Sequence, residues 1–302
     1  MLQLGVDDDV IYEIPKGKER TTDKLRNEFI RICSEIRKKG GLPQVNHPFD
    51  VSFSTRYNSE FWDMVEIFES MEIWNGATPF AAGTINAKAF KKWLSLLDEG
   101  KRLTATTGSD THNIYGDDYF GMTEWLDWMM DIVMKHPEIY PVQMNEKVAY
   151  LTWLYNKVWP RLLSWVEQSN TPSTIHNYVY TNGKNQPQEI LQAIREGHSF
   201  ISNGPLVTAE VNGVSYGEKA VLKDRTGTLS VHVFSKKPIN HLCMYTGADK
   251  KVELCAKADA AEGGFMYDIA ADEFDFGDAA WALFVADGGE NNLAISNPIL
   301  FA

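Results

Sequence analysis

Hydrophobic positions in the first two thirds of the chain follow two spacings in turn. Runs with apolar residues every three or four positions predict amphipathic helices, and short apolar runs between them predict strands. The predicted helices are 22–39, 87–99 and 188–196, and the predicted strands are 1–6, 42–46, 72–74 and 103–107. Glycine follows each predicted helix, as expected where a helix ends. Strands that alternate with helices indicate an α/β fold with a parallel sheet.

The pattern changes after residue 206. Short segments with alternating apolar and polar residues follow, separated by Gly, Asp and Asn, and they lie at 208–211, 229–234, 241–245, 265–269 and 281–285. This spacing predicts a small antiparallel β-sandwich domain over 207–302. The preceding part, 1–206, is predicted to be a separate α/β domain.

Residues 120–170 form a Trp-rich stretch within the first predicted domain. Five tryptophans fall in two helix-like segments. We interpret the stretch as a helical insertion. It either packs as ordinary helices or provides an aromatic lid or an oligomer surface.

The charge and composition of the chain limit the classes of partner that it can bind. The formal net charge is −12, so the chain should repel nucleic acid and anionic membranes. Its longest apolar runs are too short to span a bilayer, and residues 1–6 lead directly into three aspartates without the pattern of a signal peptide. The three cysteines have neither disulfide-framework nor zinc-ribbon spacing. We expect a soluble protein that is located in the cytoplasm. If a signal peptide precedes a longer form, a periplasmic or secreted location is expected instead.

Polar residues follow three successive predicted strands. His47 follows the strand at 42–46, Asn75 follows the strand at 72–74, and Asp110 and His112 follow the strand at 103–107 on a Gly-Ser turn. Because the carboxyl ends of parallel strands share one rim, these side chains should converge. Carboxylate and imidazole together suit a divalent Zn, Mn or Fe ion, so His47, Asp110 and His112 are the predicted metal ligands.

Four further residues are candidates for orienting ligands or contacting substrate. Ser109 precedes Asp110 and could hydrogen-bond a ligand. Strand alternation places Glu72 on one face and Asn75 on the other, with Asn75 nearer the rim. His176 follows the Trp-rich stretch and could reach the same place. For each of them a structural role is the alternative.

The motifs resemble those of the PHP (polymerase and histidinol phosphatase) superfamily. Its later motifs are similar to VNHP at 45–48, MEIWNG at 71–76 and TGSDTH at 107–112. The run IREGHSFISNGPL at 194–206 and the segment ISNPI at 295–299 are similar to elements of its CehA/McbA-like branch.

The resemblance implies a distorted (β/α)7 barrel that holds up to three divalent metals and hydrolyses a phosphoester or related ester. It assigns metal ligation to His47, Asp110 and His112 and implies a small-molecule ester substrate. The opening His-x-His motif of the family and its ligating Glu are absent, so we expect only the carboxyl-terminal portion of the barrel and an incomplete metal site. A homo-oligomer or a partner chain could complete the barrel. The alternative is a non-catalytic binding or structural module derived from such a hydrolase.

Overall fold

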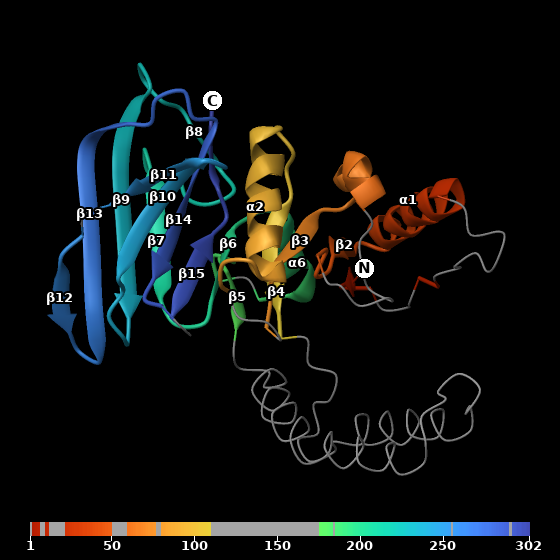
Figure 1. Ribbon diagram of the computed structural model, residues 1–302, viewed down its shortest axis with the longest axis horizontal. Helices are drawn as coiled ribbons and strands as arrows, with labels where there is room; N and C mark the ends of the chain where they lie inside the picture. Colours follow the sequence, from red (N-terminus) through yellow and green to blue (C-terminus); the bar gives the residue numbers. More distant parts are fainter. Residues whose placement is uncertain are drawn as a thin grey trace, which may run out of the picture. The chain divides into compact units, whose positions relative to one another are not determined.

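The structure is a computed structural model of the 302-residue chain (Figure 1). It describes residues 2–6, 10–11, 22–49, 59–76, 80–109, 175–183, 185–254, 256–289 and 292–302. Residues 1–108 and 175–302 belong to one compact unit, and residues 109–174 belong to a second. The Trp-rich stretch, Asp110 and His112 lie outside the described residues.

A four-stranded sheet with order β1-β2-β3-β4 forms the amino-terminal part of the first unit. Its strands and the helices near them are β1 (Leu2–Leu4), α1 (Thr22–Lys38), β2 (Leu42–Val45), the 3-10 helix η2 (Ser59–Ile67), β3 (Ser70–Asn75), α2 (Ile85–Asp98) and β4 (Thr104–Gly108). Strands β2, β3 and β4 are parallel, and β1 pairs with β2 in the antiparallel sense. The α/β expectation is therefore confirmed, and within the described residues the parallel strands form an open sheet, not a closed barrel.

Two side-chain hydrogen bonds determine where helix α2 begins and how it is attached to the sheet. The hydroxyl of Thr84 caps its first turn by accepting from the Ala87 amide, which satisfies one of the free N–H groups there. Trp93 is fully buried, and its indole N–H donates to the Leu103 carbonyl at 2.8 Å. This bond ties the helix to the segment that enters β4.

The remaining strands build two more sheets. The larger sheet has the order β11-β10-β14-β15-β6-β5 with β16 and β8 attached, and the smaller has the order β12-β13-β9-β7. The bounds are β5 (His176–Val179), α6 (Pro187–Glu196), β6 (Ser199–Ser202), β7 (Leu206–Val211), β8 (Lys219–Ala220), β9 (Thr226–Ser235), β10 (His241–Gly247), β11 (Lys250–Glu253), β12 (Ala258–Ala261), β13 (Gly264–Asp275), β14 (Trp281–Asp287), β15 (Leu293–Ser296) and β16 (Ile299–Phe301).

The two later sheets share one apolar core. Alternate residues of β9, among them Val231 and Val233, are buried in the same cluster as Met244 and Phe284 of the larger sheet. The intervening residues of β9 are more exposed, as expected when one face of a strand is buried. The smaller sheet therefore presents its other face to solvent (Figure 1).

Asparagine side chains join the first sheet to the larger one. Asn297 is fully buried, and its amide pairs with both backbone groups of Ala105, accepting from N–H at 2.7 Å and donating to C=O at 3.2 Å. Asn177 makes the same pair of bonds with Thr107, at 3.0 and 2.8 Å. Both backbone positions lie on one edge of β4, so the two amides occupy the edge where a further strand would pair.

No helix within the described ranges is both long and apolar enough to cross a membrane.

Candidate functional site

One face of the parallel sheet is polar although it is buried. The Gln44 side chain on β2 accepts hydrogen bonds from the hydroxyls of Ser70 on β3 and Thr106 on β4, at 3.1 and 2.8 Å, and it donates to Asn46 at 2.9 Å. Gln44, Ser70 and Thr106 are each at most 3% exposed. Burying a polar group costs folding free energy unless it forms a hydrogen bond, and hydrogen bonds between such groups fix their positions. This network crosses β2, β3 and β4, with Ser70 at the start of β3.

The Glu72 carboxylate is the charged group at the rim. Its side chain is 3% exposed, and one oxygen accepts from the backbone N–H of His47 at 2.6 Å. The other oxygen would be only 2.8 Å from a β carbon at position 108, so glycine is required there for close approach. The segment that follows β2 and the last residue of β4 thus meet around one buried carboxylate on β3.

His47 has an unusual backbone. Its φ is 25°, in the positive region that a residue with a β carbon rarely adopts. The following Pro48 further restricts the residue before it. Such local strain costs on the order of 1–3 kcal/mol and tends to occur at functional positions. The backbone N–H that is turned toward Glu72 belongs to this strained residue.

A β-bulge interrupts β3 next to the carboxylate. Glu72 pairs with Thr106, but the next pair in the register is Trp74 with Thr107. The extra residue breaks the simple alternation that the sequence predicts for Glu72 and Asn75. Asn75 is buried at the end of β3, where the Asn86 side chain bonds to its backbone N–H and C=O at 2.9 and 3.0 Å.

The structure brings only some of the predicted residues together. The backbone N–H of His47 contacts the Glu72 carboxylate, and Asp110 and His112 lie outside the described residues. Ser109 directly follows β4 and is partly buried. His176 is exposed at the start of β5, adjacent to the Asn177 whose amide is bound to Thr107. Three or more His, Cys, Asp or Glu side chains are not gathered in metal-binding geometry anywhere in the part that the structure describes.

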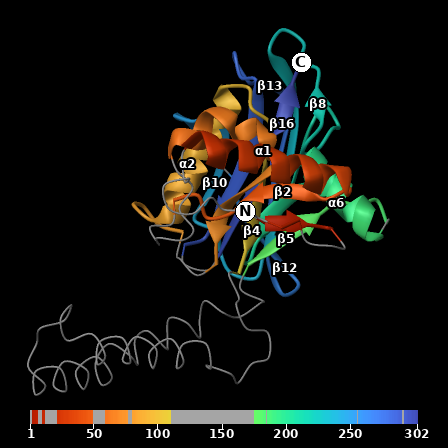
Figure 2. The same cartoon turned by 90° about the vertical axis from the view of Figure 1, so that its right-hand side faces the viewer.

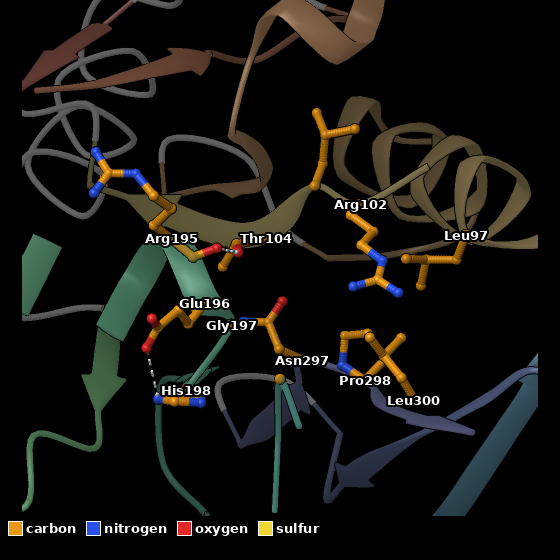
Figure 3. Close-up of a pocket in the computed structure, with 12 residues that line it drawn as sticks. Leu97, Arg102, Thr104, Arg195, Glu196, Gly197, His198, Asn297, Pro298 and Leu300 are labelled. Carbon is orange, nitrogen blue, oxygen red and sulfur yellow. Dashed lines mark hydrogen bonds and ion pairs between the residues drawn. The ribbon is translucent and has the colours of Figure 1, made fainter. Parts of the chain in front are cut away.

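A hollow of about 320 Å³ lies at the opposite end of β4 (Figure 3). Its lining residues are Leu97, Arg102, Leu103, Thr104, Arg195, Glu196, Gly197, His198, Gly217, Asn297, Pro298 and Leu300. Arg195 is held there by Glu69 at 2.7 Å and by the Gly41 carbonyl at 3.1 Å. None of the predicted site residues lines this hollow, which is assembled from segments far apart in the sequence.

Cys33 and Cys243 are buried cysteines. Burial is the main cause that raises the pKa of Cys33 to about 12 and that of Cys243 to about 11. Such thiols are protonated at neutral pH and are poor nucleophiles and metal ligands. Cys255 lies outside the described residues.

No known protein family, curated protein or solved structure matches this chain.

Proposed function

We propose that this chain is a metal-dependent hydrolase of the PHP type, acting on a phosphoester or related ester at the carboxyl rim of β2, β3 and β4. The observation that carries the proposal is the buried Glu72 carboxylate, which contacts the strained His47 at the end of the neighbouring strand. A buried anion at a strand rim is costly and is usually compensated by a cation or by strong hydrogen bonds. The open parallel sheet would then be part of a distorted (β/α)7 barrel.

The donors in the sequence fit a divalent cation. His47 offers an imidazole nitrogen, and Asp110 and His112 follow Ser109 directly in the chain. Nitrogen and carboxylate ligands together suit Zn²⁺, Mn²⁺ or Fe²⁺. Such a cation would lower the pKa of a bound water and polarise the ester oxygen.

The residues around the rim have separate tasks in this proposal. Glu72 holds the His47 backbone through the 2.6 Å bond and adds negative charge beside the ligands. The buried Gln44 network holds β2, β3 and β4 together on the same face of the sheet. Ser109, Asn75 and His176 are proposed to orient ligands or substrate.

Metal content measured on the purified chain tests the proposal. We expect bound Zn, Mn or Fe in the wild type and hydrolysis of bis-p-nitrophenyl phosphate, with both lost in His47→Ala and His112→Ala. Glu72→Gln should weaken metal affinity by about 10- to 100-fold, the range for groups that support metal ligands. His241→Ala is the matched control, because His241 is an exposed histidine on β10 whose Nδ1 already pairs with Glu253 at 2.9 Å.

Two results would contradict the proposal. One is a wild-type chain without bound metal even after incubation with each ion. The other is bound metal that persists in the His47 and His112 variants. Absence of metal, together with unchanged stability of His112→Ala, would favour the alternative of a non-catalytic module derived from a hydrolase.

A further inference from the structure

Three side chains on the solvent face of the smaller sheet form a Ser-His-Asp relay. The Oγ of Ser230 lies 2.9 Å from Nε2 of His232, and Nδ1 of His232 lies 2.6 Å from a carboxylate oxygen of Asp268. Ser230 and His232 are two residues apart on β9 and therefore share a face, and Asp268 is directly opposite His232 on β13. The strand register, together with the two hydrogen bonds, holds the three groups in line.

The hydrogen bonds fix the direction of proton transfer. A carboxylate can only accept, so Nδ1 of His232 carries the proton of the bond to Asp268. In the neutral imidazole with this tautomer, Nε2 accepts the hydroxyl proton of Ser230. This is the arrangement in which histidine acts as a general base for a serine nucleophile.

We propose that Ser230 is an activated nucleophile that accepts the acyl group of neutral or cationic activated esters, independently of the metal site proposed above. The charge preference follows from Glu210 on β7, which pairs with Ser230 across the strand and would repel an anionic ester. Ala270 pairs with Ser230 on the other side and leaves room for an acyl group. His232 and Asp268 are 54% and 52% exposed at their side chains, so small esters can reach them.

The same sheet limits the reaction to esters with good leaving groups. Strand β9 pairs with β13 on one side and β7 on the other, so its backbone N–H groups are used within the sheet. They cannot form an oxyanion hole, and the loss of one such donor slows serine hydrolases by about 10²–10³-fold. Solvent must stabilise the oxyanion at this exposed face. We therefore expect reaction with aryl esters but not with amides.

The reaction with p-nitrophenyl acetate has two steps, acylation of Ser230 and hydrolysis of the acetyl-serine. The Ser230 oxygen forms a bond to the acetyl carbon, its proton passes to Nε2 of His232, and the bond to p-nitrophenolate breaks. His232 then releases this proton to solvent. In the second step His232 removes a proton from water while the water oxygen bonds to the acetyl carbon. The bond from the acetyl carbon to the Ser230 oxygen breaks, the proton passes from Nε2 to that oxygen, and acetic acid leaves and ionises to acetate.

Acid-quenched peptide mass mapping after brief exposure of the full chain to p-nitrophenyl acetate tests the proposal. We expect acetylation of Ser230 that persists in a metal chelator, which separates it from the proposed metal site. His232→Ala should reduce the rate at Ser230 by about 10²-fold, the lower range for general-base catalysis. Asp268→Asn should also reduce it, since the tautomer is no longer fixed. His241→Ala is the control, because His241 forms a similar exposed pair with Glu253 and should leave the labelling unchanged.

Two outcomes would overturn the proposal. One is acetylation of Ser230 no faster than that of the other exposed serines, or unchanged in His232→Ala. The other is hydrolysis that persists in Ser230→Ala with an acetyl group on His232, since the imidazole would then be the nucleophile. Circular dichroism of each variant shows that the sheet is intact, and all three substituted residues are on its solvent face.

Discussion

The variant Asn297→Ala tests whether asparagine side-chain amides take the place of a neighbouring strand by bonding to the backbone at the edge of β4. The Asn297 side chain accepts from the Ala105 N–H and donates to the Ala105 and Ser199 carbonyls and the Ser199 hydroxyl. Asn297, Ala105 and Ser199 are all buried, so water cannot easily take over these bonds. A buried polar group left without a partner costs about 1–3 kcal/mol.

Alanine at 297 leaves the N–H and C=O of Ala105 without the amide, so we expect a loss of about 2–6 kcal/mol. That is a large part of the 5–15 kcal/mol typical of a folded domain. Asn177→Ala is the matched control, because this amide makes the same two bonds to Thr107 but belongs to an exposed residue. Water can replace it there, and we expect a loss of about 1 kcal/mol.

Urea unfolding followed by circular dichroism measures the difference between the two variants, with equal m-values as the requirement for comparison. Hydrogen exchange of the Ala105 amide gives a local measurement, and it should accelerate strongly only in Asn297→Ala. Equal destabilisation of the two variants, within about 0.5 kcal/mol, would refute the reasoning, because burial would then not decide the cost.

Five more outcomes follow from the surroundings of single residues. Trp93→Phe removes the buried indole N–H bond and should cost about 1–3 kcal/mol in urea unfolding. Gly217→Ala places a β carbon 2.0 Å from a backbone oxygen at a φ of 80°, so a loss of about 3 kcal/mol or more is expected in the same assay. Gly108→Ala should displace the carboxylate beside it and lower metal content more than stability. Burial raises the pKa of Cys33 to about 12 and of Cys243 to about 11. Unfolded thiols therefore ionise first, and stability should fall as the pH rises above the ordinary thiol value. A thiol reagent at pH 8 should react with these two only after unfolding.

The sequence was sufficient for the elements whose patterns are local. Helices α1, α2 and α6 lie within one or two residues of the predicted ranges, because an amphipathic period and a terminal glycine are visible in a short window. The five predicted strands after residue 206 are present as β7, β9, β10, β13 and β14.

The elements that the sequence did not predict depend on distant partners. Strand β5 has the sequence HNYV without an apolar alternation, and it is a strand because it pairs with β6 and because Asn177 binds Thr107. Strands β11 and β12 are short, exposed edge strands whose pairing depends on β10 and β13. Such pairing is tertiary information, and propensity does not contain it.

The candidate site was predictable in outline but not in its contacts. The rule for parallel strands placed His47 and Asn75 at one rim, with Glu72 at the start of its strand. The structure instead brings the Glu72 carboxylate into contact with the His47 backbone N–H. The bulge after Glu72 and the strained φ of His47 have no local marker in the sequence. The requirement for glycine at position 108 follows only from the structure, which places the Glu72 carboxylate next to it.

The Ser230–His232–Asp268 relay was also predictable only in part from the sequence. A serine and a histidine two positions apart on a strand share a face, and this much follows from the sequence. Asp268 joins them only through the register of β13, which places it opposite His232. Because the two proposed sites differ in what activates the nucleophile, a chelator should stop hydrolysis at the rim of β2, β3 and β4 and leave acylation of Ser230 intact. Loss of both activities in a chelator would instead assign all of the chemistry to the metal site.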